Sequence, residues 1–342
     1  MLRILSLTPF LIASFYFFHF AFVGIMLIYL PKILLEGGFG SVEIGVVFSI
    51  IPFVRFLMPL LFVKIFTINR EAILFLSIMF FIATCSLYFS IDHFYLLIIT
   101  QILIGITISL LVPLVETIAL SELGKEKYGK IRLYGSLGFI ASALYFADMI
   151  AEKSFIIYSL IFFAFLTSFF VIKILEKSRN NIDLFNTDNK DFSLKNHKYL
   201  WLNIFLMQVS FGAFYNFFTI YETEHGISID IVSYLWTFGV VCEILMLFFQ
   251  TPLLKRFDLI FLIAISTFIT SIRWLLLFLF PDSLIVSFFT QSLHALGFAL
   301  YHTATITYLY QVYKEKNLAQ QFYAGISYGL GLFVGSIFAG AF

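Results

Sequence analysis

Ionisable side chains lie inside long apolar segments of this sequence. Arg55, Glu116, Glu243 and Arg273 each stand within a run of hydrophobic residues. An ionisable group in mid-membrane costs from about 2.5 to more than 10 kcal/mol unless it is paired or faces water, and such groups mark solute or proton pathways. The alternative is structural, because buried pairs and hydrogen bonds between helices also hold membrane bundles together.

Histidines in the same kind of segment could carry protons. His19, His294 and His302 lie in apolar runs, and imidazole titrates near neutral pH. Positions 294 and 302 are about two helical turns apart, so the two side chains share one face. A bis-histidine haem site is the alternative, but it needs histidines on facing helices. The spacing therefore favours a proton path, with no cofactor.

The composition places these residues in lipid. Of 342 residues, 61% are apolar, 20% are aromatic and only 12% are charged. Soluble domains are about 45–50% apolar and about 25% charged, so this chain cannot hide its hydrocarbon from water. A net charge of +1 gives no basic field for nucleic acid. Cys85 and Cys242 have no CxxC spacing, so neither a disulfide framework nor a metal site is predicted.

Membrane-spanning helices must position the charged residues. A run of at least about 18 apolar residues is long enough to cross the hydrocarbon. Eleven such runs are present, and Asp148 and Glu222 fall near the ends of two of them, where we expect both to be solvated. The runs cover residues 8–34, 42–65, 72–91, 94–120, 133–151, 155–175, 199–221, 231–254, 259–280, 284–313 and 321–342.

The basic residues predict how the chain is oriented. If Arg3 is cytoplasmic, seventeen lysines and arginines fall in loops on that side. The opposite side then holds only Lys32 and Lys153. Cytoplasmic loops carry an excess of Lys and Arg, so the amino terminus is expected in the cytoplasm.

The chain divides into two parts around a polar stretch. Residues 176–198 are turn-rich and of mixed charge, which predicts a cytoplasmic linker between domains 1–175 and 199–342. Short strings recur after 189 to 194 residues, as in Tyr134-Gly135 and Tyr328-Gly329. Parallel repeats of this kind build many secondary transporters. Six spans precede the linker and five follow it, so we expect a two-bundle fold with a twelfth span missing.

Five segments, in order along the chain, carry a resemblance to a known family. They are residues 112–116 (VPLVE), 128–140 (YGKIRLYGSLGFI), 233–243 (SYLWTFGVVCE), 271–273 (SIR) and 293–302 (LHALGFALYH). The chain resembles the oligosaccharide–proton symporters of the major facilitator superfamily. The similarity is greatest to the phenylpropionate-permease branch, and lactose permease is a more distant relative. The resemblance implies an all-α polytopic protein in a bacterial-type cytoplasmic (inner) membrane.

The resemblance also implies which residues bind a solute. Glu116 and Arg132 match a carboxylate and a guanidinium that hold the sugar in lactose permease. Phe139 matches a tryptophan that stacks on the sugar ring, and Glu243 matches a carboxylate that joins substrate recognition to proton coupling. These residue types suit the roles, because charged groups make directional hydrogen bonds and an aromatic face suits a sugar or a phenyl ring.

The same resemblance implies proton coupling, although this sequence departs from lactose permease at the position that carries the proton. Arg273 and His294 match the arginine and histidine around the proton site. The glutamate that carries the proton in lactose permease is replaced here by Gly297. Glu243 or His302 would therefore have to carry it.

These observations predict a transporter and not an enzyme. The first expectation is proton-coupled symport, by alternating access, of a small organic solute such as an aromatic acid or a sugar. An exporter or uniporter on the same scaffold is the alternative, and Gly297 supports it. A non-transporting membrane redox or structural subunit is an alternative of another class. Partners are expected to be the solute, protons and lipid, with the chain acting as a monomer.

Overall fold

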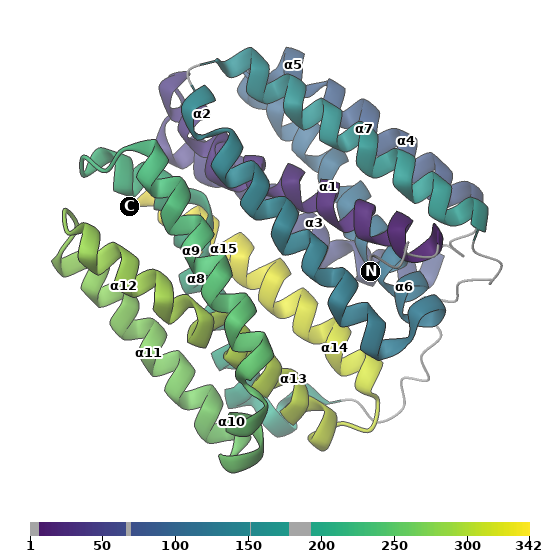
Figure 1. The fold of residues 1–342 in the computed structure, drawn as a ribbon, viewed down its shortest axis with the longest axis vertical. Helices are drawn as coiled ribbons and strands as arrows, with labels where there is room; N and C mark the ends of the chain where they lie inside the picture. The colour runs from purple at the N-terminus through teal and green to yellow at the C-terminus, as the bar shows by residue number, and fades with distance from the viewer. Residues whose placement is uncertain (1–6, 66–69, 151, 178–192) are drawn as a thin grey trace, which may run out of the picture.

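The computed structural model describes residues 7–65, 70–150, 152–177 and 193–342, and the regular elements of these ranges are helices (Figure 1). The first group of elements, up to residue 177, is α1 Leu7–Ile28, α2 Leu30–Glu36, α3 Ser41–Ile65, α4 Arg70–Cys85, α5 Leu87–Ser90, α6 Phe94–Tyr145, η1 Ala147–Met149 and α7 Lys153–Lys177. Most of the expected linker, residues 178–192, lies outside the described residues.

The second group begins at residue 194. It comprises η2 Leu194–His197, α8 Lys198–Glu224, α9 Ile229–Phe249, α10 Thr251–Arg256, α11 Leu259–Leu279, α12 Leu284–Ala295, η3 Leu296–Leu300, α13 Tyr301–Val312, α14 Lys316–Ala324, η4 Gly325–Gly331 and α15 Leu332–Ala341. The segments η3 and η4 are π-helical and interrupt α12–α13 and α14–α15. Such interruptions occur frequently at functional sites.

The all-α membrane fold expected from the sequence is confirmed. Within the described ranges, ten helical segments are long and apolar enough to cross a membrane. The further span expected over residues 133–151 corresponds to the last part of α6, whose first part is the candidate span Phe94–Leu123.

The long helical segment α6 folds back on itself. Residues 116 and 132 would be about 24 Å apart on a straight helix, at 1.5 Å per residue. Arg132 Nε nevertheless lies 3.9 Å from Glu116 Oε1. Tyr128, between them, donates a hydrogen bond to the same carboxylate oxygen at 2.6 Å. The chain therefore reverses between these residues, and α6 consists of two antiparallel limbs.

The helices pack in a pattern that repeats between the two groups. In the first group α1 packs on α6, and in the second group α8 packs on α15 and η4. Between the groups, α3 packs on α15 and η4, while α9 packs on α6. If the spans of each group are counted from α1 and from α8, the second span of each group contacts the fifth span of the other.

Glycines allow the closest helix contacts. A Cβ on Gly138 of α6 would lie 2.0 Å from the Phe17 carbonyl oxygen of α1. A Cβ on Gly335 of α15 would lie 2.2 Å from the Val209 carbonyl oxygen of α8. Side chains at these positions would push the helices apart, as expected for bundles held by small residues.

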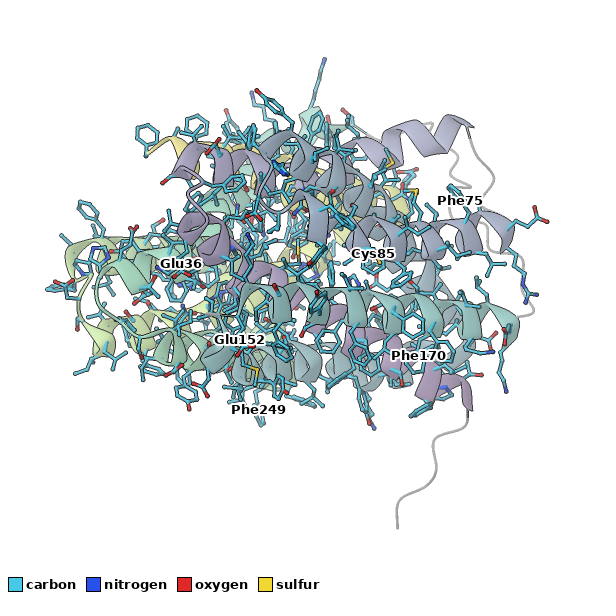
Figure 2. All side chains as sticks on the ribbon, turned by 90° about the horizontal axis from the view of Figure 1, so that it is seen from above. Glu36, Phe75, Cys85, Glu152, Phe170 and Phe249 are labelled. Carbon is cyan, nitrogen blue, oxygen red and sulfur yellow. The ribbon has the colours of Figure 1, made fainter. Side chains whose placement is uncertain are left out.

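Large apolar side chains cover the outside of the bundle. Phe75 of α4 and Phe249 of α9 are exposed and lie at its periphery (Figure 2). Phe278 and Ile285 are exposed as well. Apolar surface of this extent matches an environment of lipid chains and not water.

The two groups touch firmly at one end of the bundle. Helix α1 begins at what we call the N-terminal end and runs to the opposite end (Figure 1). Tyr29 directly follows Ile28, the last residue of α1. The Tyr29 hydroxyl donates to the Ala143 carbonyl of α6 and lies 2.9 Å from Ser233 Oγ of α9. The ring of Phe139 lies 6.0 Å from that of Trp236, again joining α6 to α9. These contacts hold the groups together at the opposite end.

Candidate functional site

Arg132 and Glu116, expected to bind a solute, lie next to each other across the two limbs of α6. Their closest atoms are 3.9 Å apart, and the side chains are 35% and 38% exposed. A separation this long between half-exposed groups makes a weak ion pair. Burial and the adjacent Glu116 carboxylate raise the pKa of Tyr128, which lies between the spans. Its phenol therefore remains a hydrogen-bond donor to Glu116.

Aromatic rings of α1 support the Arg132 guanidinium. Its carbon lies 4.3 Å from the centre of the Phe20 ring and 5.1 Å from that of Tyr16. Stacked in this way, a guanidinium keeps its N–H groups free at the edge. Arg132 makes no hydrogen bond to the described residues, so this edge is open to an anionic or hydroxyl-bearing ligand.

Glu243 approaches this cluster from the second group of helices. It lies on α9, is half-buried, and has no hydrogen bond or ion pair within the described ranges. The charge of Arg132 acts on Glu243 across the two groups. Tyr215 of α8 and Tyr328 of η4 are also within electrostatic range of Glu243.

Arg55 and His19, whose roles the sequence left open, join the same cluster. The charge of Arg55 on α3 acts on Tyr328 of η4 and on His19 of α1. The imidazole of His19 is buried and stacked on the Phe15 ring, at 5.6 Å between centroids. Tyr328 is a further residue that sequence reasoning missed, because a single tyrosine among many carries no distinguishing signal.

His302 connects to the cluster through hydroxyl groups. Its Nδ1 lies 3.1 Å from the Tyr323 hydroxyl and 3.2 Å from the Tyr328 hydroxyl. The charge of Arg132 also acts on His302. We define the central cluster as the residues from both groups that are connected by these hydrogen bonds, the Arg132–Glu116 ion pair and the electrostatic interactions. They are His19, Arg55, Glu116, Tyr128, Arg132, Tyr215, Glu243, His302 and Tyr328.

Arg273 and His294 form a second, fully enclosed contact. Arg273 is 0% exposed; its Nη1 lies 3.1 Å from His294 Nδ1 and its Nη2 donates to Gln291 Oε1 at 3.2 Å. The rings of Phe214 and Trp274 each lie 4.3 Å from the guanidinium carbon. Within the described residues no carboxylate lies within ion-pair distance of Arg273, so aromatic faces and neutral acceptors stabilise this buried cation.

Gly297, one turn after His294, leaves no room for a larger side chain. A Cβ at this position would lie 2.3 Å from Thr270 Oγ1 of α11. The departure from the proton-carrying glutamate is therefore built into the packing of η3 on α11. His294 and His302 each contact other residues and not a facing histidine, and no metal-binding group of three His, Cys, Asp or Glu side chains occurs in the part of the chain described.

The remaining predicted residue, Phe139, is nearly enclosed. It is 8% exposed, and its ring packs against Trp236 where α6 meets α9. In this arrangement it joins the two groups of helices.

Glu222 is a correction to the sequence prediction. It was expected to be solvated, but it is 0% exposed. Ser287 Oγ of α12 lies 3.1 and 3.0 Å from its two carboxylate oxygens. The Ser287–Glu222 contact joins segments 65 residues apart, which hydropathy along the chain does not reveal. Asp148 is exposed, as expected.

Comparisons with known proteins identify a family and two relatives that share part of the chain. The sequence model of the MFS_1 like family matches residues 10–342. The probable 3-phenylpropionic acid transporter of Escherichia coli (strain K12) is 24% identical over 261 residues, which are 72% of this chain and 68% of that protein. The uncharacterized transporter YwbF of Bacillus subtilis (strain 168) is 24% identical over 232 residues, covering 65% of this chain and 58%, less than two thirds, of that protein.

Solved structures share the fold at lower identity. The nucleoside transporter NupG superposes with a TM-score of 0.77 at 16% identity, over 98% of this chain and 91% of that chain. The D-xylose–proton symporter superposes with a TM-score of 0.67 at 12% identity, over 98% and 89% of the two chains. Identities this low show a shared fold and leave function to the residues of the site.

Proposed function

The chain belongs to the MFS_1 like family of membrane transporters, and from that premise we propose that it imports a small aromatic carboxylic acid together with protons. The observation that carries the proposal is the central cluster, in which charged and hydroxyl groups from both groups of helices act on one another. A solute held there would contact both groups, as alternating access about a midplane site requires.

The charges of the central cluster favour an acid over a neutral sugar. Arg55 has no carboxylate partner within the described residues, and the Arg132–Glu116 pair is long. A carboxylate solute would complete the missing charge pairing through charge-assisted hydrogen bonds. The half-buried ring of Phe20 beside Arg132 suits a phenyl group. The name of the E. coli relative, a probable 3-phenylpropionic acid transporter, agrees with this chemistry.

The contacts between the helix groups support an inward-facing state. Tyr29 and Phe139 join the groups at the end away from the N-terminus. Glu116 and Arg132 remain more than a third exposed. With the N-terminus in the cytoplasm, as the lysine and arginine distribution indicates, the central cluster communicates with the cytoplasm. We propose that residues 1–175 and 199–342 rock about this cluster, in a monomer of the cytoplasmic membrane.

Proton coupling is assigned to Glu243 and His302 in the central cluster. Glu243 has no hydrogen-bond or ion-pair partner within the described ranges and faces the charge of Arg132. Protonation of Glu243 would remove its negative charge, which would leave Arg132 to interact with the solute carboxylate. His302 contacts two hydroxyl groups that can exchange protons with it. His294 is less suited, because Arg273 Nη1 already approaches its Nδ1 and a second positive charge there would repel the guanidinium.

A uniporter or exporter is the second candidate, and Gly297 favours it. The packing of Gly297 on Thr270 excludes a carboxylate at the position where lactose permease is expected to carry its proton. In that case the solute would move without a proton, and a pH gradient would not drive its accumulation.

Transport in proteoliposomes distinguishes the two candidates. We expect vesicles holding the purified protein to accumulate labelled 3-phenylpropionate when the outside is acidic, and to stop when a protonophore collapses the gradient. Arg132→Lys keeps the charge but loses the guanidinium fork, so it should weaken uptake. Lys130→Arg, at an exposed position on the same segment, is the matched control. Uptake that is unchanged by the protonophore would refute symport in favour of the uniporter.

A further inference from the structure

Glu222 is a buried acid that the proposed mechanism does not use. It lies on the last turn of α8, at the end of the bundle opposite the N-terminus, and is 0% exposed. Its partner Ser287 lies on the first turn of α12 and is also 0% exposed. Both residues belong to the second group of helices. Glu243, the acid of the central cluster, is a separate group on α9.

The hydrogen bonding of this pair suits two protonation states. Ser287 Oγ is nearly equidistant from the two carboxylate oxygens, at 3.1 and 3.0 Å. A hydroxyl can donate one hydrogen bond and accept others. It can therefore donate to Glu222 when the acid is ionised, and accept the acid proton when the acid is neutral. The heavy atoms need not move between the two states.

No neutralising cation lies beside the pair in the described part of the chain. Within the described residues, no Lys, Arg or His nitrogen lies within ion-pair distance of Glu222. His225, one turn further on, and the neighbouring Tyr221 interact with it electrostatically. The other ionisable groups on the surrounding elements make no ion pair with it in these ranges. They are Glu224 of α8, Lys32 and Glu36 of α2, Asp230 of α9, Asp282 before α12 and His294 of α12.

Burial of an ionised carboxylate with one neutral donor is costly. Such a charge is normally paired with a cation or neutralised by a proton. Ser287 is the sole hydrogen-bond partner found for the Glu222 carboxylate in the described ranges. His225 is half-buried and adjoins an exposed turn at Gly226, so it offers a route by which a proton can enter from that end.

We propose that Glu222 and Ser287 form a proton-binding site at the end of the bundle opposite the N-terminus. The proton bonds to a Glu222 carboxylate oxygen, and its release restores the anion. The role of this site in transport rests on the proposed symport. In that scheme the Glu222–Ser287 pair binds the proton on the outer side, and Glu243 and His302 bind a proton in the central cluster. The proton site itself stands on burial and geometry.

Infrared difference spectroscopy on purified protein tests the proton site without any solute. Exposed carboxyls titrate near pH 4, so spectra are compared across the range above it. All samples carry Glu243→Gln, which removes the other acid proposed to take up a proton. In this background we expect a protonated-carboxyl band that decreases as pH rises, and the same band when Glu224, an exposed acid two residues away from Glu222, is replaced by Gln. The band should be absent when Glu222→Gln is added. A band that persists in Glu222→Gln would overturn the proposal.

Transport then tests whether this proton is the coupled one. In proteoliposomes, Glu222→Gln should exchange 3-phenylpropionate within about twofold of the wild-type rate, while accumulation driven by a pH gradient falls at least tenfold. Accumulation equal to that of the wild type would overturn the coupling role. If the wild type itself shows no gradient-driven accumulation, the proposed symport fails, whereas loss of the infrared band in Glu222→Gln still supports the proton site.

Discussion

Replacing Gly135 by alanine tests whether Arg132 is held in position for a solute. A Cβ at position 135 would lie 2.9 Å from Arg132 Nη1 and 2.8 Å from Phe20 Cδ2. Ordinary contacts of a Cβ begin at 3.4 Å, so both side chains must retreat by about 0.5 Å. The added methyl group therefore moves the guanidinium and its supporting ring without removing any charge.

The expected loss of affinity follows from the hydrogen bonds that the Arg132 guanidinium would make to the solute. A hydrogen bond to a charged group contributes about 1.5–3 kcal/mol, and about 1.4 kcal/mol corresponds to a tenfold change in affinity. Loss of one such bond to the carboxylate of 3-phenylpropionate should raise its Kd about 10- to 100-fold. The folded state should be little affected, because the Arg132–Glu116 ion pair is long and half-exposed.

Titration calorimetry with 3-phenylpropionate measures this effect. Gly129→Ala is the matched control, because a Cβ at that position would meet nothing within 4 Å. We expect Gly129→Ala to bind as the wild type does and Gly135→Ala to bind weakly, with equal melting temperatures. If the two alanine variants bind equally well, Arg132 is not in the binding site and the reasoning is refuted.

Two further predictions concern packing and conformation. Gly297→Ala should lower the free energy of unfolding by about 1–3 kcal/mol through overpacking, since its Cβ would meet Thr270 Oγ1 at 2.3 Å. Thermal unfolding should show that the double variant with Thr270→Ala regains this stability. A double variant as unstable as Gly297→Ala would contradict the contact. Tyr29→Phe removes the hydroxyl that joins α6 and α9, worth about 1 kcal/mol or about fivefold in population. Spin labels at Glu36 and Ser228 should then report more separated helix groups by electron–electron distance measurement, and an unchanged distribution would count against the closed end.

Much of the membrane fold could be predicted because burial in lipid leaves a strong mark on the sequence. The length of the apolar runs alone located the spans. In lipid, backbone N–H and C=O groups must bond to one another, and a helix satisfies them within one segment. The reversal within α6 was harder to predict, since residues 121–132 are polar enough to resemble a loop, whereas the structure includes them in the helical segment Phe94–Tyr145. The expected linker could not be compared, because residues 178–192 lie outside the described ranges.

The candidate site was predictable only in part. The contact of Arg273 with His294 joins two residues that the family resemblance had already placed in one role. Arg132 and Glu116 lie near the ends of their apolar runs, where hydropathy alone does not distinguish a binding site from solvated charges. The fold-back of α6 is what brings them together. Glu222 contacts Ser287 of α12, which is distant in sequence. Periodicity reports the environment of a helix and not which neighbour covers it.

The central claim is that residues from both helix groups line one solute site, and a double-mutant cycle on Arg132 and Glu243 tests it most directly. Binding of 3-phenylpropionate is measured by calorimetry for Arg132→Lys, Glu243→Gln and the double variant. Independent sites add within about 0.3–0.5 kcal/mol. Because the Arg132 charge acts on Glu243 across the groups, we predict a coupling energy above about 0.5 kcal/mol. Strict additivity, with both single variants binding more weakly, would contradict a shared site.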